Sequence, residues 1–242
     1  MKIVGIVPAR YASVRFPGKP LAPLAGKPML LHVLEAARAA RTVSRVAVAT
    51  DDERIAAAVR GAGGEAILTS LQAASGTDRL AEAARSIPAD VYVNIQGDEP
   101  MMSPRNIDRA VEALLDSENR EIATLAIPMP PADASDPNTV KVAVARDGRA
   151  LYFSRAPIPF PRSGAPAYRK HLGLYAYRAA ALAELAALPP SPLEKTESLE
   201  QLRWLEAGYD IWVARAWSDS IGVDTPADLA RVEEFLRKEA VS

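Results

Sequence analysis

Four short segments of the sequence carry residues that together suit phosphate chemistry. The first, IVPARYASVRFPGKPL at residues 6–21, holds Arg10, Arg15 and Lys19 among prolines, and no acidic residue precedes Glu35. The other three are SGTDR at 75–79, QGDEP at 96–100 and GVDTP at 222–226. Reaction at a polyphosphate requires cations that neutralise the phosphate oxygens, and a bound Mg²⁺ requires one or two carboxylates. The four segments supply both kinds of group.

Each segment alone also has a plain structural interpretation. Cations on a loop are often only solvated, and Ser-Gly-Thr-Asp before a helix can be a capping turn. Asp-Glu-Pro after a strand can be an ordinary turn, and Asp224 can simply stabilise a helix N-terminus. The combination favours function, because cations on one loop meet carboxylates that follow other strands. The Walker pattern is absent, and no Gly-x-Gly-x-x-Gly follows the first apolar run, which argues against a P-loop NTPase and a dinucleotide-dependent dehydrogenase.

Alternating apolar runs and helical patterns indicate how these segments are positioned. Short β-branched-rich runs predict buried parallel strands at 3–7, 45–50, 65–69 and 91–95. Apolar residues recurring at three and four predict helices at 29–40, 52–60 and 78–87, with Asp51 and Thr77 as candidate N-caps of the last two. Short links imply right-handed crossovers, so residues 1 to about 118 are predicted to form a doubly wound α/β half with a mostly parallel sheet. Such sheets bind ligands at the carboxyl ends of their strands.

The pattern changes in the second half of the chain. Strands with little helix between them are predicted at 122–127, 140–145, 150–153 and 171–177, with Asp147-Gly148 as a hairpin turn. A helix at 195–207, a strand at 211–216 and a last helix at 226–238 follow, the last capped by Thr225. We expect a single domain over residues 1–242 in which residues 121–177 form an antiparallel insertion. The proline-rich stretch 157–166 is predicted to be a mobile loop.

Composition excludes several classes of protein. The chain has 242 residues, 49% of them apolar and 24% charged, which is typical of a soluble globular protein. It has no cysteine, so disulfides, thiolate metal sites and a cysteine nucleophile are excluded. A net charge of −1 argues against a nucleic-acid partner. The apolar runs are too short for a membrane span and the N-terminus lacks a signal-peptide core, so we expect no membrane association and a cytoplasmic location.

A resemblance to a known family rests on eight motifs that occur in order: PARYASVRFPGKPL, ATDDERI, SGTDRLAE, NIQGDEP, LYFSRAPIP, KHLGLYAYR, SPLEKTESLEQLRWLE and GVDTPADL. Together they closely resemble the 3-deoxy-manno-octulosonate (Kdo) cytidylyltransferases, from Ile6 to about Val232, with a slight departure at Phe16, where the family often has Leu. The resemblance implies a nucleotide-diphospho-sugar transferase-like fold and a homodimer, with the insertion at residues 121–177 contributing to sugar binding and to the dimer interface. It also implies transfer of CMP from CTP to the anomeric hydroxyl of Kdo, with Mg²⁺ and release of pyrophosphate, for lipopolysaccharide synthesis.

The resemblance further implies roles for residues of the nucleotide site. Asp98 and Asp224 match the metal carboxylates, and with Arg10 and Lys19 they form the expected catalytic set. The expected nucleotide contacts are Pro8, Ala9, Arg10, Arg15, Lys19, Ser75, Gly76, Thr77, Arg79 and Gln96. For Arg79, a structural ion pair is an equal alternative. No protein nucleophile is required, because the sugar hydroxyl attacks the α-phosphorus in line while positioning and electrostatics carry the reaction.

The expected contacts to the acid sugar are Gln96, Arg155, His171, Tyr175, Glu194 and Gln201. Arg155 and His171 are the candidates for binding the acid group, but His171 and Tyr175 lie in an apolar run and can equally be core residues. The other histidine, His32, is expected to be structural. Two alternatives remain: a cytidylyltransferase for a related sugar acid, such as 8-amino-Kdo or a sialic acid, and an inactive nucleotide-binding protein of the same fold. The sugar motifs favour Kdo over sialic acid, and the presence of both metal carboxylates argues against inactivity.

Overall fold

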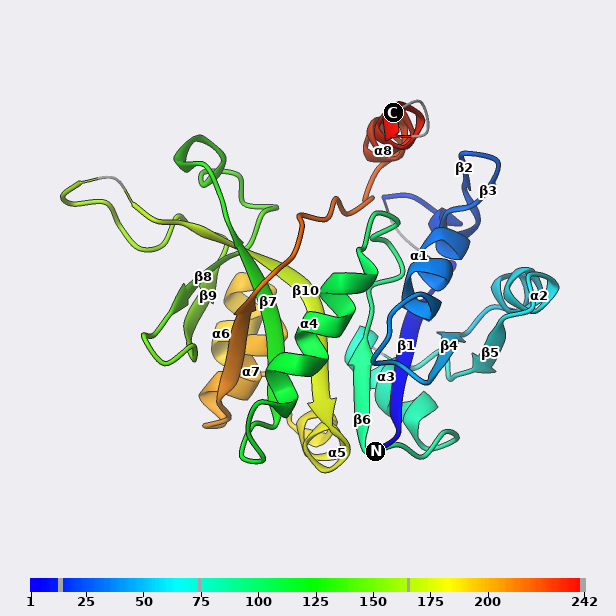
Figure 1. Ribbon diagram of the computed structural model, residues 1–242, viewed down its shortest axis with the longest axis horizontal. Helices are drawn as coiled ribbons and strands as arrows, with labels where there is room; N and C mark the ends of the chain where they lie inside the picture. Colours follow the sequence, from blue (N-terminus) through cyan, green and yellow to red (C-terminus); the bar gives the residue numbers. More distant parts are fainter. Residues whose placement is uncertain (13–14, 74, 165, 240–242) are drawn as a thin grey trace. The chain divides into compact units, whose positions relative to one another are not determined.

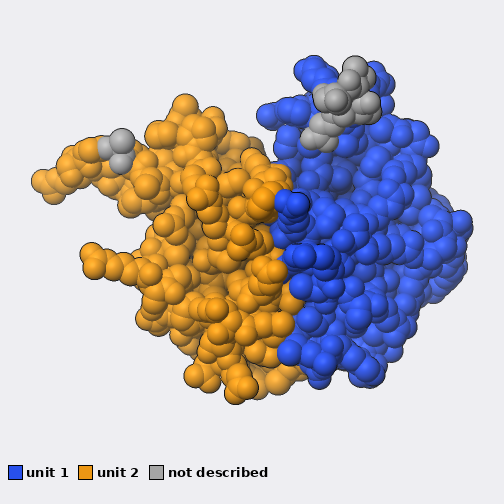
Figure 2. All heavy atoms as spheres, viewed as in Figure 1, with its two compact units in different colours: residues 1–108, 220–242 blue, residues 109–219 orange. Residues whose placement is uncertain are grey.

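The computed structural model describes residues 1–12, 15–73, 75–164 and 166–239, and it divides into two compact units. Unit 1 consists of Met1–Asp108 and Ser220–Ser242, and unit 2 consists of Arg109–Asp219 (Figure 2). Helix α4 (Pro104–Leu115) begins in unit 1 and ends in unit 2. The doubly wound half predicted for residues 1 to about 118 therefore ends earlier and also includes the C-terminal helix. Among the described residues, no helix combines the length and apolar character needed to cross a membrane.

Unit 1 contains a parallel sheet whose strands lie in the order β5-β4-β1-β6 (Figure 1). Its strands are β1 (Ile3–Ala9), β4 (Arg45–Thr50), β5 (Glu65–Leu68) and β6 (Val91–Asn94). Its helices are α1 (Met29–Arg38), α2 (Glu53–Gly61), α3 (Gly76–Ala84) and α8 (Pro226–Glu239), and short elements are η1 (Lys19–Leu21), β2 (Pro23–Leu24) and β3 (Lys27–Pro28). The predicted strands and helices of this part are confirmed to within a few residues at their ends.

The strand order reverses direction beside β1. From β1 the chain passes to β4 and β5 on one side and then returns through α3 to β6 on the other side. Right-handed crossovers place α1 and α2 on one face of the sheet and α3 on the opposite face. Residues in the middle of the sheet, such as Ile6, Val48 and Val93, are consequently fully buried, which explains why these runs are apolar without alternation. The carboxyl ends of β1 and β6 flank the crevice where doubly wound sheets bind ligands.

Two of the predicted helix caps are wrong by one or two residues. The side chain of Asp52, not Asp51, caps α2 by accepting a hydrogen bond from the Arg54 N–H at 2.9 Å. Ser75, not Thr77, caps α3, where the Ser75 hydroxyl accepts from the Asp78 N–H at 3.0 Å and the Asp78 carboxylate accepts from the Ser75 N–H. Thr225 caps α8 as predicted, since its hydroxyl accepts from the Asp228 N–H at 3.3 Å.

Unit 2 is built on a mixed sheet. Strand β10 pairs antiparallel with β7 and β8, β8 and β9 form the predicted hairpin, and β11 is parallel to β7. The strands are β7 (Ile122–Pro128), β8 (Lys141–Val144), β9 (Ala150–Ser154), β10 (Arg169–Arg178) and β11 (Ile211–Arg215). The other elements are η2 (Pro131–Asp133), α5 (Ala179–Ala187), α6 (Pro192–Glu197) and α7 (Gln201–Glu206). The stretch 157–166 contains no helix or strand in its described residues, and residue 165 lies outside them.

The predicted helix at 195–207 is in fact two short helices, α6 and α7. The chain breaks at Ser198, which adopts a left-handed conformation with φ 52°. Arg155 explains the break, because its guanidinium donates to the carbonyls of Glu197 at 2.7 Å and Ser198 at 3.3 Å, so these carbonyls are held by a side chain from outside the helix. Helices α4 and α5 were not predicted from the sequence.

An aromatic cluster that includes His171 forms part of the core of unit 2. The His171 ring lies 4.8 Å from the Phe153 ring and 5.4 Å from the Tyr175 ring, between centroids. Its Nε2 is 3.0 Å from the Thr124 hydroxyl. That hydroxyl has one proton, which it donates to a carbonyl of the irregular stretch of β10, the nearer being Leu174 O at 2.8 Å, so His171 Nε2 must be the donor to Thr124. Burial lowers the pKa of His171 to about 3, and the imidazole is therefore neutral near pH 7.

The neutral state of His171 predicts how stability depends on pH. Below about pH 6.5 the unfolded chain protonates this imidazole, whereas the folded protein keeps it neutral down to about pH 3. The unfolded state then binds more protons, so the His171 contribution is complete above about pH 7 and is lost as the pH falls, at up to about 1.4 kcal/mol per pH unit. We expect the unfolding free energy of the wild type to fall more steeply between pH 7 and pH 4.5 than that of His171→Gln.

The Gln side chain removes the titrating group and retains a donor for Thr124. Urea unfolding of both proteins at a series of pH values measures the difference, and groups other than His171 contribute equally to both curves. Parallel curves would show that His171 is not held neutral in the fold.

Candidate active site

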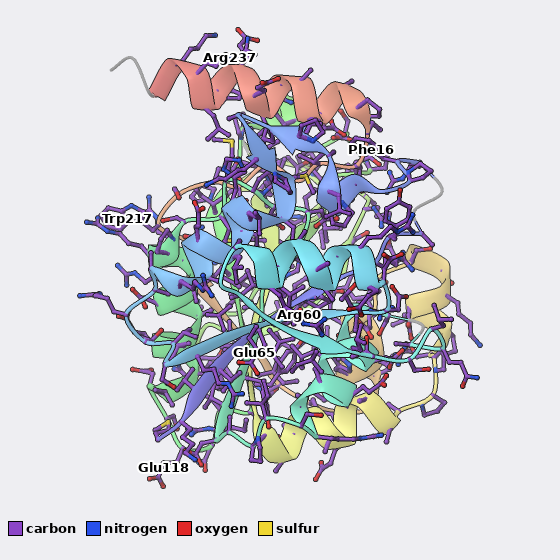
Figure 3. The ribbon with its side chains drawn as sticks, turned by 90° about the vertical axis from the view of Figure 1, so that its right-hand side faces the viewer. Phe16, Arg60, Glu65, Glu118, Trp217 and Arg237 are labelled. Carbon is purple, nitrogen blue, oxygen red and sulfur yellow. The ribbon has the colours of Figure 1, made fainter. Side chains whose placement is uncertain are left out.

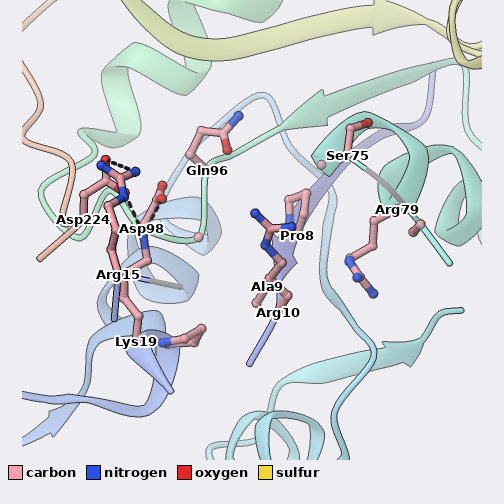
Figure 4. A pocket seen from close by; sticks show the side chains of 14 residues that line it. Pro8, Ala9, Arg10, Arg15, Lys19, Ser75, Arg79, Gln96, Asp98 and Asp224 are labelled. Atoms are coloured by element: carbon pink, nitrogen blue, oxygen red, sulfur yellow. Dashed lines mark hydrogen bonds and ion pairs between the residues drawn. The ribbon is translucent and has the colours of Figure 1, made fainter. Parts of the chain in front are cut away.

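A polar cavity of about 410 Å³ lies in unit 1 at the carboxyl ends of β1 and β6 (Figure 4). It brings together all the residues that were predicted for the nucleotide and the metal, with the exception of Thr77, which is buried in the first turn of α3. The residues that line it are Pro8, Ala9, Arg10, Arg15, Lys19, Pro20, Ala73, Ser75, Gly76, Arg79, Gln96, Gly97, Asp98 and Asp224. In Figure 4, Lys19, Arg15 and the two carboxylates gather on one side of the cavity, and Ser75 and Arg79 lie on the other.

The floor of the cavity is set by a close approach between two backbone segments. Pro8 is the last residue but one of β1, and Gly97 lies in the segment that follows β6. A Cβ atom built on Gly97 would lie 2.5 Å from the Pro8 carbonyl oxygen, so only glycine fits at this position without moving the backbone. This contact keeps Gln96 and Asp98 next to the start of the cationic loop.

The cationic loop is folded around Gly18. This residue has φ 72°, a conformation that favours glycine, and its N–H donates to the Tyr11 carbonyl at 2.9 Å. The turn leads directly into η1, whose first residue is Lys19. Lys19 is only 9% exposed, and its ammonium reaches the cavity, whereas Arg10 is an exposed residue of the cavity rim.

Asp98 and Asp224 converge on the Lys19 ammonium, although they lie far apart in the sequence. The Lys19 Nζ is 2.8 Å from an Asp98 oxygen and 3.2 Å from an Asp224 oxygen, and Arg15 contacts the second Asp224 oxygen at 3.0 Å. A backbone bond supports this arrangement, because the Val223 N–H donates to the Asp98 carbonyl at 2.8 Å. Two carboxylates held around one cation form a donor set of the kind that binds Mg²⁺.

These two carboxylates suit Mg²⁺ better than they suit a metal whose ligands all come from the protein. Within the described ranges, no three His, Cys, Asp or Glu side chains form a group that could hold a metal ion. Mg²⁺ characteristically takes one or two carboxylates and fills its other positions with water and phosphate oxygens. Asp98 and Asp224 therefore match a metal that arrives with a nucleotide.

Arg79 has structural partners that sequence reasoning did not find. It is 3% exposed, and its guanidinium donates to the Asp51 carboxylate at 2.7 Å and to the Thr69 hydroxyl at 2.5 Å. Asp51 directly follows β4 and Thr69 directly follows β5. Through these two contacts, Arg79 joins α3 to the ends of two neighbouring strands. These contacts favour the structural alternative for Arg79, which forms a wall of the cavity. The sequence feature that could have indicated Asp51 as the partner of Arg79 is its position directly after a predicted strand.

The residues predicted for the sugar lie in unit 2, apart from Gln96. Arg155 uses N–H groups to hold three main-chain carbonyls, those of Pro137, Glu197 and Ser198. Both Glu194 oxygens accept from Arg203, at 2.5 and 2.7 Å, and Glu194 also closes the capping box of α6 with Ser191. Arg155 and Glu194 therefore have clear structural roles.

Tyr175 and Gln201 complete the predicted sugar set. Gln201 begins α7 and is 6% exposed. The Tyr175 hydroxyl is buried and has no hydrogen-bond partner in the described part of the chain, while burial raises the pKa of this phenol. His171 is neutral, so it cannot be a cationic ligand for an acid group near pH 7.

His32 has the structural role expected for it, since its Nε2 lies 2.8 Å from the Leu24 carbonyl oxygen.

Comparison with known proteins agrees with this site. The cytidylyltransferase family pattern matches residues 4–211. A 3-deoxy-manno-octulosonate cytidylyltransferase of Syntrophobacter fumaroxidans is 56% identical over 248 residues, which span 100% of this chain and 99% of the relative. The enzyme of the same name from Acidobacterium capsulatum is 51% identical over 238 residues, 98% of this chain and 97% of the relative.

A solved structure extends the comparison to three dimensions. It is that of a CMP:2-keto-3-deoxy-manno-octonic acid synthetase complexed with CTP, which is 46% identical to this chain with a TM-score of 0.95. The match covers 99% of this chain and 100% of the synthetase. The agreement of sequence, fold and extent confirms the predicted α/β fold class and the predicted resemblance. This chain belongs to the family of 3-deoxy-manno-octulosonate cytidylyltransferases.

Proposed function

We propose that this protein transfers the cytidylyl group of CTP to Kdo, giving CMP-Kdo and pyrophosphate. One observation carries the proposal: the three cations of the first loop, Arg10, Arg15 and Lys19, line a single cavity with the two carboxylates at the crevice of a doubly wound sheet. The chain is 46% identical over nearly its whole length to a synthetase whose structure contains CTP. A cavity of about 410 Å³ is large enough for a small-molecule ligand.

The charged residues of the cavity are assigned either to the triphosphate or to Mg²⁺. Lys19 and Arg15 lie beside the two carboxylates, and Arg10 lies on the rim, so the three cations can contact different oxygens of one triphosphate. Mg²⁺ held by Asp98 and Asp224 would supply positive charge at the α-phosphate and at the attacking sugar hydroxyl. Because Lys19 contacts both carboxylates, the phosphate-binding cation and the metal ligands are neighbours, which favours binding of the metal and the triphosphate together.

The nucleoside part of CTP is assigned to the opposite wall. Ser75 and Gly76 begin α3 there, and the start of this helix carries N–H groups and a partial positive charge. Pro8 and Ala9 offer backbone atoms at the end of β1. Gln96, directly after β6, is assigned to the nucleotide or the sugar. None of these roles requires a covalent intermediate on the protein.

Several further properties are proposed with this activity. Residues Arg155, His171, Tyr175, Glu194 and Gln201 of unit 2 are the candidates for the Kdo site, and among the described residues the Tyr175 hydroxyl has no hydrogen-bond partner. Members of the family are typically homodimers, and we propose the same for this chain, with residues 121–177 at the interface. A cytoplasmic location and a role in lipopolysaccharide synthesis are part of the same proposal.

The proposed reaction is tested by substrate-dependent release of pyrophosphate. With CTP, Kdo and Mg²⁺, the purified protein is expected to release pyrophosphate in equal amount to the CMP-Kdo formed, and removal of Mg²⁺ by EDTA should stop the reaction. Parallel reactions with 8-amino-Kdo and a sialic acid define the sugar. Release with another sugar acid but not with Kdo would reassign the substrate, and no release with any of them would contradict the proposed activity.

The metal carboxylates give a second test. Asp98→Asn and Asp224→Asn keep the side-chain volume and remove the charge that attracts a hard cation. We expect each to lower turnover roughly a thousandfold. The unfolding free energy should change by about 1 kcal/mol or less, since the ion pairs are partly exposed. A higher Mg²⁺ concentration should restore part of the activity.

Asp90→Asn is the matched control, because Asp90 precedes β6 at the end opposite Asp98 and accepts a hydrogen bond from the Lys2 N–H at 2.6 Å. Its turnover should equal that of the wild type. If either cavity variant also keeps near-normal turnover, that residue is not a metal ligand.

A further inference from the structure

The side chain of Asp228 binds the backbone of the segment that carries Asp224. One Asp228 oxygen, Oδ2, accepts three hydrogen bonds: from the Asp224 N–H at 3.1 Å, the Thr225 N–H at 2.9 Å and the Thr225 hydroxyl at 2.8 Å. Asp228 does not line the cavity. It therefore contacts the proposed metal ligand only through that ligand's main chain.

A second contact holds the same segment from the other side. The Val223 N–H donates to the Asp98 carbonyl at 2.8 Å, so the main chains of the two carboxylate-bearing segments are joined one residue before Asp224. Asp224 is thus held by a backbone bond at residue 223 and by Asp228 at residues 224 and 225. With both neighbours fixed, the direction of the Asp224 side chain is restricted.

Helix α8 is itself anchored to the part of unit 1 that leads to the cationic loop. Val223 and Val232 are fully buried with Leu24 and Met29, and Phe16 packs partly buried against this cluster. Figure 3 shows Phe16 close to α8. Helix α8, which carries Asp228, is therefore packed against the segment that follows Lys19. The hydrogen bonds of Asp228 in turn hold the backbone of Asp224 to this helix.

We infer that Asp228 is a positioning residue for the metal site, which holds the Asp224 carboxylate beside Asp98 through three hydrogen bonds to one oxygen. This inference rests on the proposed function of Asp224 as a metal ligand. Groups that orient metal ligands commonly change metal affinity or activity by about 10- to 100-fold when removed. Loss of Asp228 should thus weaken the metal site without removing any ligand from it.

Asp108 provides a matched control in unit 1. Its Oδ1 accepts from the Thr42 N–H at 2.9 Å and the Thr42 hydroxyl at 2.9 Å, which is the same pair of contacts that Asp228 makes to Thr225. Asp108 is 3% exposed and does not line the cavity. Asp108→Ala therefore removes a buried carboxylate of the same chemistry at a position that holds no proposed ligand.

The test is the affinity for Mn²⁺ in the presence of CTP, measured by electron paramagnetic resonance of free Mn²⁺, together with turnover as a function of Mg²⁺ and urea unfolding. For Asp228→Ala we expect the Mn²⁺ dissociation constant and the half-saturating Mg²⁺ concentration to rise about 10- to 100-fold. Asp228→Asn retains an oxygen in the same place, so most of the affinity should be kept. Asp108→Ala should lower stability and leave both metal constants unchanged.

Thr225→Val removes one of the three bonds, together with the cap bond from the Asp228 N–H, and keeps the shape of the side chain. Two bonds to the Asp228 carboxylate remain, so it should give a smaller shift in the same direction even if Asp228→Ala does not fold. Wild-type metal constants in both Asp228→Ala and Thr225→Val, or an equal shift in Asp108→Ala, would overturn the inference. Asp224→Asn distinguishes the positioning role of Asp228 from the proposed metal site itself. If Asp224→Asn weakens Mn²⁺ binding while Asp228→Ala does not, only the positioning role fails. If Asp224→Asn binds Mn²⁺ like the wild type, the proposed metal site itself fails.

Discussion

The site depends on holding two carboxylates close together. Asp98 and Asp224 repel each other, yet both contact the same Lys19 nitrogen, at 2.8 and 3.2 Å. Two carboxylates that contact the same nitrogen are tolerated where that nitrogen is cationic and where the backbone prevents the carboxylates from separating. Lys19 meets the first condition, and the bond from Val223 N–H to the Asp98 carbonyl helps to meet the second. The same arrangement is suited to a divalent cation with bound phosphate.

The fold supplies this arrangement through the order of its strands. Because the chain passes from β1 to one side of the sheet and returns to the other, the segments after β1 and β6 lie on either side of one crevice. The glycine at 97 lets these segments touch, and α8 brings Asp224 to the same place from the far end of the chain. The cations of the first loop and the carboxylates of two later segments thus meet without any of them being adjacent in sequence.

Much of this could be predicted from the sequence, because each catalytic candidate follows an apolar run or precedes a helix with a recognisable start. The errors concern interactions between distant segments. Asp51 and Asp52 are adjacent carboxylates with the same cap potential, and only the buried Arg79 decides that Asp51 forms an ion pair while Asp52 caps the helix. The break between α6 and α7 likewise depends on Arg155, which is far from it in the sequence.

Helices α4 and α5 were not predicted from the sequence, for two different reasons. In α4, Ile107, Val111 and Leu114 are fully buried at helical spacing, so the sequence itself contains the pattern of this helix. In α5 the sequence AAALAELAA offers little contrast between its faces, and no period can be read from it. The sugar candidates show a further limit: the residue types of Glu194 and Arg155 suit a ligand, but their partners are main-chain and side-chain groups of unit 2.

The most direct test of this account is a crystal structure of the protein with CTP and Mn²⁺, in which anomalous scattering locates the metal. The account predicts a manganese peak coordinated by both Asp98 and Asp224 and by triphosphate oxygens, with the Lys19 ammonium and the Arg10 guanidinium on the phosphates. A triphosphate bound away from this cavity, or a metal coordinated by neither carboxylate, would contradict it.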